Sequence, residues 1–141
     1  MYYINQTQID ERLQFLPVIS GVLNRLAASW IEGDVMLQFA QERALLLAIE
    51  TVTDIGSLLI DGFMMRDASS YEDIVDILAG EGVFPAEVAG VLSELVRLRK
   101  QLVQDYVAYP RQRLHALTAQ LPEVLQRFAE AVPVFIRKEM V

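Results

Sequence analysis

Residues 35–64, VMLQFAQERALLLAIETVTDIGSLLIDGFM, decide the fold of this chain. Their apolar side chains recur at spacings of three and four, which is the period of an α-helix. They cover most of the circumference of that helix, through Val35, Phe39, Leu45, Leu46, Leu47, Ile49, Ile55, Leu58 and Leu59. A surface helix needs only one apolar stripe, so this helix belongs in the centre of a bundle or at a subunit interface. Asp34 precedes the stretch and is expected to cap its N-terminus.

The flanking sequence predicts four more helices, because it has helical periods and the whole chain contains only seven glycines and five prolines. The first helix of the chain follows Asn5 or Thr7 and ends before Gly33. The third begins at the capping-box pair Ser69 and Glu72 and ends at Gly80. The fourth runs from Pro85 to about Val107, and the fifth carries Leu114 to Phe128. Pro17 is expected to bend the first helix, and Pro122 and Pro133 leave the continuity of the fifth open. The expected fold is all-α: an antiparallel bundle of about five helices, in a single helical domain over residues 1–141.

Composition restricts the classes of function that remain. The chain has no cysteine and one histidine, so disulfides, thiolate zinc sites and a cysteine nucleophile are excluded, and no metal site or cofactor is expected. A net charge of −7 predicts that any RNA contact uses a local basic patch. With 53% hydrophobic and 22% charged residues in 141, self-association as a homodimer is expected. No segment is expected to span a membrane and none resembles a secretion signal, which favours the cytoplasm.

A charged residue interrupts the apolar face of the fourth predicted helix. Residues about 100° apart place Arg99 in one stripe with Leu92, Leu95, Leu102 and Tyr106. A guanidinium in such a seam requires a carboxylate partner or an opening to solvent. The second helix offers a polar line of Glu50, Asp54, Ser57 and Asp61, and we expect Asp54 to face Arg99. The pair is either a structural link between helices or part of a functional site, and the spacing alone leaves both open.

The segment RLRKQLVQDY, residues 97–106, resembles the signature of the HepT-like branch of the HEPN superfamily: arginine, four residues, histidine, one residue, tyrosine. Arg99 and Tyr106 match that pattern, and Gln104 occupies the histidine position. Residues 48–56 resemble the family's second helix, and residues 70–78 with the following turn resemble its third. The likeness extends roughly from Thr7 to Phe128 and is greatest with uncharacterised cytosolic members of the family.

The resemblance implies a dimeric helical bundle whose two motifs face each other across a cleft and cut RNA without a metal ion. HepT-like toxins are typically encoded beside a nucleotidyltransferase antitoxin that transfers AMP to the motif tyrosine. By position, Arg99 would bind the scissile phosphate, and Tyr106 would be the residue modified. RNA and such an antitoxin are therefore the expected partners, besides a second copy of the chain.

Gln104 departs from the family pattern. Metal-free cleavage requires a group that exchanges protons near neutral pH, as histidine does, whereas glutamine does not titrate. His115 lies outside the motif, and we expect it on an exposed helix face rather than as a substitute base. Three hypotheses remain: a toxin-antitoxin-related or RNA-binding dimer with weak or no ribonuclease activity, an active metal-independent endoribonuclease, and a structural interaction module.

Overall fold

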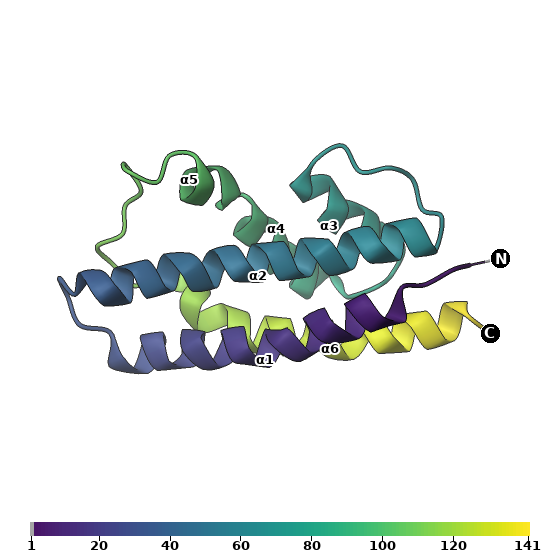
Figure 1. Cartoon of the computed structure of the whole chain (residues 1–141), viewed down its shortest axis with the longest axis horizontal. Coiled ribbons are helices and arrows are strands. Elements are labelled where there is room, and N and C mark those ends of the chain that lie inside the picture. The colour runs from purple at the N-terminus through teal and green to yellow at the C-terminus, as the bar shows by residue number, and fades with distance from the viewer. Residues whose placement is uncertain (1) are drawn as a thin grey trace.

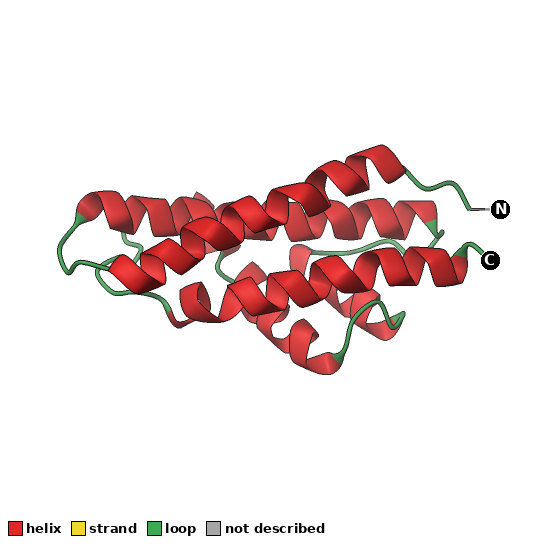
Figure 2. Cartoon of the chain, turned by 90° about the horizontal axis from the view of Figure 1, so that it is seen from below, coloured by secondary structure: helices red, strands yellow, loops and turns green. Residues whose placement is uncertain are grey.

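The computed structural model describes residues 2–141 and contains six helices within them. These are α1 (Gln6–Ser29), α2 (Val35–Gly62), α3 (Tyr71–Gly80), α4 (Ala86–Val96), α5 (Arg99–Val103) and α6 (Ala116–Glu139). The three long helices α1, α2 and α6 lie side by side, while α3, α4 and α5 pack across α2 (Figures 1 and 2). The first described residues and the C-terminus lie at the same end of this bundle. The all-α prediction is confirmed.

Local capping explains where three of these helices begin. Asn5 and Asp34 accept hydrogen bonds from the backbone N–H groups of Gln8 and Leu37, each at 3.2 Å, which confirms the cap predicted for α2. The cap of α3 was predicted at Ser69 but is Ser70, whose hydroxyl accepts from the Asp73 N–H at 3.0 Å. The Asp73 carboxylate in turn accepts from the Ser69 N–H at 2.9 Å. The acid three residues after Ser70 therefore forms the capping interaction, instead of the glutamate three residues after Ser69.

The fourth predicted helix is divided at Arg97 and Leu98 into α4 and α5. The backbone remains right-handed there but tightens, because the Leu98 N–H donates to the Leu95 carbonyl, three residues back, at 3.0 Å. α5 ends at Val103, four residues before the predicted end, so Tyr106 lies beyond the helix. By contrast, α6 continues from Ala116 to Glu139 through both of its prolines.

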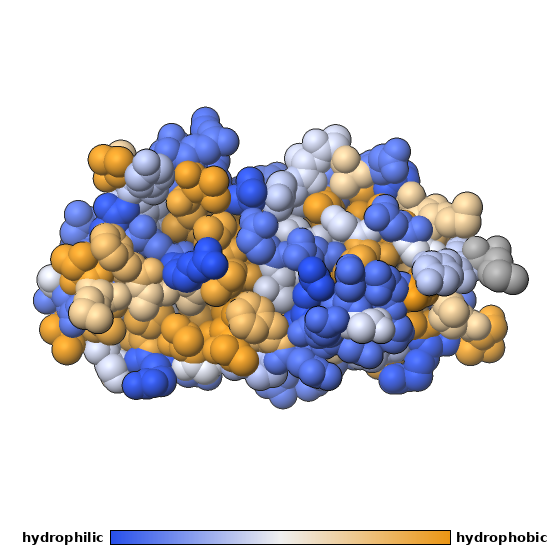
Figure 3. Space-filling view, in the orientation of Figure 1, coloured by the Kyte–Doolittle hydropathy of each residue, from blue (hydrophilic) through white to orange (hydrophobic). Residues whose placement is uncertain are grey.

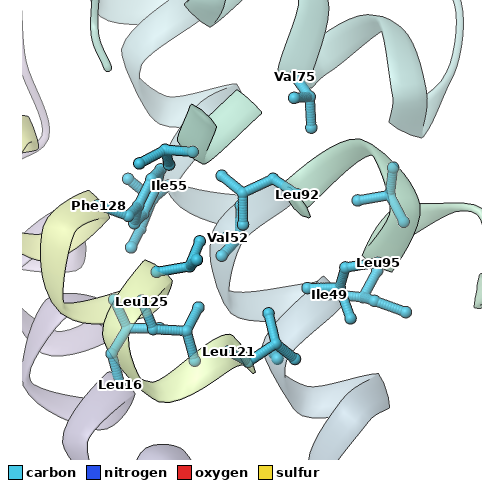
Figure 4. Close-up of a cluster of buried hydrophobic side chains, with 14 of the residues drawn as sticks. Leu16, Ile49, Val52, Ile55, Val75, Leu92, Leu95, Leu121, Leu125 and Phe128 are labelled. Atoms are coloured by element: carbon cyan, nitrogen blue, oxygen red, sulfur yellow. The ribbon is translucent and has the colours of Figure 1, made fainter. Parts of the chain in front are cut away.

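One hydrophobic core joins the long helices to α3 and α4. It contains side chains from all six helices, with Leu102 from α5. Others are Leu16, Ile49, Val52, Ile55, Val75, Leu92, Leu95, Leu121, Leu125 and Phe128 (Figure 4). Helices α2 and α3 approach closely at Gly56, where a Cβ atom would collide with Ile74 and lie 3.1 Å from the Leu78 Cδ1 atom. Within residues 2–141, no helix is both long and apolar enough to cross a membrane.

Candidate functional site

Arg99 is the first residue of α5 and contacts two other helices. Its Nε atom donates to the Glu50 carboxylate on α2, at 2.8 Å from Oε1. Its Cζ atom lies 4.1 Å from the ring centroid of Tyr71, the first residue of α3, which is a cation–π geometry. Glu50 bonds only to Nε, and the terminal nitrogens of Arg99 form no hydrogen bond with any residue from 2 to 141. The guanidinium is therefore oriented by α2 and α3 while retaining donors for a ligand.

The predicted pairing of Arg99 with Asp54 is wrong. Asp54 instead accepts a hydrogen bond from the Nε atom of Arg12 on α1, at 3.2 Å. Glu50 and Asp54 are one turn apart on the same polar line of α2. The helical period therefore identified the correct face of α2, but the alignment of α5 along α2 decides which turn meets Arg99, and that alignment depends on packing between helices.

The Arg99–Glu50 pair is half-exposed and does not lie in a sealed apolar seam. The side chains are 32% and 36% exposed, respectively. The hydrogen bond to Glu50 raises the pKa of Arg99, so the guanidinium stays charged. A solvent-screened pair of this kind contributes about 0.2–1 kcal/mol to stability. This contribution is well below the roughly 3–5 kcal/mol that breaking a buried pair costs. A role in stabilising the fold therefore explains the presence of Arg99 only weakly.

The other two motif residues follow the end of α5. The backbone N–H of Gln104 donates to the Lys100 carbonyl at 2.8 Å, which closes the last turn, and its side chain is exposed. Tyr106 is 58% exposed. The structure therefore brings Arg99 together with Glu50 and Tyr71, and it does not place Tyr106 on a continuous helical stripe with Arg99, as the period predicts.

Sequence reasoning missed Glu50 and Tyr71 as partners of Arg99, and it missed a second ion pair nearby. Arg111, just after Pro110, binds Glu42 of α2 through two nitrogens, at 2.7 and 3.1 Å. Glu42 precedes Glu50 by eight residues, so both carboxylates lie on a similar face of α2. The spacing of these two glutamates along α2 is the sequence signal that could have pointed to this second ion pair. Among residues 2–141, no group of three or more histidine or acidic side chains is arranged to hold a metal ion.

His115 is partly buried at the N-terminus of α6, so the expectation of an exposed helix histidine is wrong. Its Nδ1 atom accepts a hydrogen bond from the Leu117 N–H at 3.0 Å, which caps the helix. Burial lowers the pKa of His115, and the nearby charge of Glu94 partly opposes that effect. An Nδ1 atom that accepts a hydrogen bond cannot carry a proton, so the neutral imidazole is the form that caps the helix.

Acidification is expected to weaken the fold through His115. The unfolded chain takes up this proton near pH 6.5 and the folded chain only at lower pH, so the unfolded state binds more protons between the two values. The contribution of His115 is thus complete above about pH 6.5 and is lost as the pH falls through the lowered pKa of the folded state. Urea unfolding should show a steeper loss of stability as the pH falls below 6.5 for wild type than for His115→Asn, whose amide oxygen can also cap. Identical pH dependence of the two proteins would contradict this role.

Comparison with known proteins finds a family and a relative that match most of this chain. The family model described as "Ribonuclease HepT-like" matches residues 12–132. The Bacillus subtilis (strain 168) protein named "Putative RNase YutE" is 32% identical over 141 residues, covering 99% of this chain and 95% of YutE. The solved structure of YutE, described as a cytosolic protein of unknown function, superposes with a TM-score of 0.87 at 31% identity, over 99% of this chain and 95% of YutE.

A more distant structure has the same fold. It is described as a toxin-antitoxin with AMP-PNP, and it matches with a TM-score of 0.76 at 16% identity, over 89% of this chain and 97% of its own. At that identity the likeness concerns the arrangement of helices alone. The family match and the relative that is 32% identical decide the assignment: this chain belongs to the HepT-like ribonuclease family.

Proposed function

We propose that this protein is a dimeric, RNA-binding member of the HepT-like family, related to toxin-antitoxin systems, with weak or no ribonuclease activity. The observation that carries the proposal is the state of Arg99. Glu50 and Tyr71 orient its guanidinium, and its terminal nitrogens remain available to a phosphate. Gln104, which cannot titrate, stands where the family motif has histidine. Binding of RNA is thereby supported more strongly than its cleavage.

The active endoribonuclease remains the second candidate. The 32% identical relative carries the name of an RNase, and Arg99 and Tyr106 are both present in this chain. In that reading, Gln104 only orients the 2′-hydroxyl, while Arg99 and Tyr106 stabilise the charge that develops. Metal-free cleavage of RNA by wild type, compared with Gln104→His, separates the two candidates.

Tyr106 is the residue that we propose as an acceptor of AMP from a nucleotidyltransferase partner. Its side chain is 58% exposed and lies beyond the end of α5, so an enzyme can reach the phenol without unfolding a helix. We also propose that residues 1–141 form one domain, supported by the single core to which all six helices contribute, and that the protein acts in the cytoplasm, as its relative YutE is described.

A second copy of the chain is the partner for which the surface gives most support. Exposed apolar side chains gather over the C-terminal half of α1, the N-terminal half of α2 and α5, while the rest of that face is mostly polar (Figure 3). We call the exposed apolar side chains of these segments, of the loop between α1 and α2 and of the residues just after α5 the apolar patch: Val18, Val22, Ile31, Val35, Met36, Phe39, Val103, Tyr106 and Val107. It includes the motif tyrosine, so a dimer formed through the patch would bring two motifs near one interface.

Loss of Arg99 is expected to weaken RNA binding about tenfold, since one charge-assisted contact to phosphate contributes about 1.5 kcal/mol or more. Arg12→Ala is the matched control, because Arg12 is also half-exposed and also pairs with a carboxylate of α2. Fluorescence anisotropy with a labelled single-stranded RNA of mixed sequence measures both Kd values. Equal losses in Arg99→Ala and Arg12→Ala would indicate general electrostatics and overturn the assignment of Arg99.

A further inference from the structure

The segment between α5 and α6, residues 104–115, carries two of the three motif residues and has little regular structure. We call it the strap. It leaves α5 and passes beside the N-terminal part of α2 before entering α6 (Figure 1). Most of its side chains are exposed, and Tyr109 is buried. A segment with so few packed side chains keeps one conformation only if specific contacts hold its backbone.

One arginine connects the strap both to α2 and to itself. Arg111 forms a fork with Glu42, and the two side chains are only 20% and 15% exposed. Its terminal nitrogens also donate to the backbone carbonyls of Tyr106 and, at 3.5 Å, of Val107. The same guanidinium lies 5.7 Å from the ring centroid of Phe39 on α2. Arg111 therefore links the first half of the strap, including the backbone of Tyr106, to a rigid helix.

The second half of the strap is held independently. Gln41, the residue before Glu42, is buried; its amide donates to the Arg113 carbonyl at 3.2 Å and accepts from the His115 N–H at 2.9 Å. Of these two contacts, the one nearer to Tyr106 along the chain is at Arg113, seven residues after Tyr106. Loss of the Arg111 fork would leave the strap anchored at its C-terminal side while freeing the part that contains Tyr106.

We propose that Arg111, held by Glu42, is a positioning residue of the RNA-binding site: it fixes the strap so that Gln104 and Tyr106 are presented beside Arg99. This inference rests on the proposed RNA binding for its functional consequence. Arg111 acts through the backbone of the strap, and its own charge is already neutralised by Glu42. A lysine cannot replace it, because only the planar guanidinium reaches two carboxylate oxygens and the carbonyl groups together.

Glu42→Gln tests the proposal by the sign of its effect. The substitution removes a negative charge near the site, so simple electrostatics predicts tighter binding of RNA. The positioning role predicts weaker binding, by about fivefold or more, because an amide oxygen cannot accept the whole fork. Arg111→Lys keeps the charge and should weaken binding similarly. Glu87→Gln is the matched control: it removes the same charge from an exposed α4–α6 pair with Arg127, and it should leave affinity unchanged or slightly tighter.

A second measurement reports on the strap without RNA. NMR order parameters of the backbone amides of residues 105–109 should be near those of the helices in wild type and Glu87→Gln, and fall below about 0.6 in Glu42→Gln and Arg111→Lys. Unchanged order in both variants would overturn the proposal. Lost order with tighter RNA binding in Glu42→Gln would overturn the positioning role. A wild-type protein that binds no RNA would contradict both the proposed function and the positioning role of Arg111. The order parameters would still decide whether Arg111 fixes the strap.

Discussion

Gln104→His is expected to raise metal-free RNA cleavage by about 10²–10⁴-fold over wild type, which is the usual contribution of a general acid or base. The substitution adds the one component of the family motif that the chain lacks. Arg99 is already oriented by Glu50 and Tyr71, and Tyr106 is in place two residues beyond Gln104. The Gln104 side chain is exposed at the end of α5, so an imidazole fits there without disturbing the core. Cleavage of a mixed single-stranded RNA pool in the presence of a chelator measures the gain.

Two further variants show whether the gain comes from the motif. Gln101→His adds the same imidazole to an exposed position of α5, three residues away, and should remain as inactive as wild type. Gln104→His combined with Arg99→Ala should lose the gain. Strong, Arg99-dependent cleavage by wild type would instead establish the active endoribonuclease. Inactivity of both wild type and Gln104→His would contradict the prediction and leave the binding and structural hypotheses, which the Arg99→Ala binding experiment separates.

The sequence predicted those parts of the fold that depend on local chemistry. Asp34 caps α2 as expected, because a carboxylate there can reach the backbone N–H groups of the first turn. The periods of α2 also predicted its burial, and Leu45, Ile49, Ile55 and Leu59 are fully buried. Both signals act within a few residues along the chain, so a single sequence contains them completely.

The parts of the site that the sequence did not predict depend on how separate segments align. The choice between Glu50 and Asp54 as the partner of Arg99 depends on the position of α5 along α2. The fork between Arg111 and Glu42 joins residues that are 69 positions apart, and it holds a strap whose own sequence has no helical period. The end of α5 at Val103 leaves Tyr106 outside the helical stripe that the period predicts.

The N-terminal half of α2 departs from its predicted burial in a way that indicates a partner. Val35, Met36 and Phe39 are exposed, although the same periods continue through the buried half of the helix. Exposed apolar surface of this kind is typical of interaction sites, and it supports the proposed dimer. A stable dimer interface, of the order of 2,000 Å² in total, would cover the apolar patch and account for the apolar character of α2 on nearly all sides.

Met36→Glu is therefore expected to convert the protein from a dimer to a monomer at low micromolar concentration. Met36 is 82% exposed in the single chain, so the substitution has no core to disturb and should leave the unfolding of the monomer nearly unchanged. In a two-fold symmetric interface the change occurs twice, and each buried carboxylate costs about 2 kcal/mol or more, which together weakens association roughly a thousandfold. Light scattering across a dilution series measures this shift.

The control Val134→Glu introduces the same charge at an exposed apolar position of α6, outside the patch, and should remain dimeric. A wild-type protein that is monomeric at low micromolar concentration would refute the dimer, and loss of the dimer in Val134→Glu but not in Met36→Glu would place the interface on a different face.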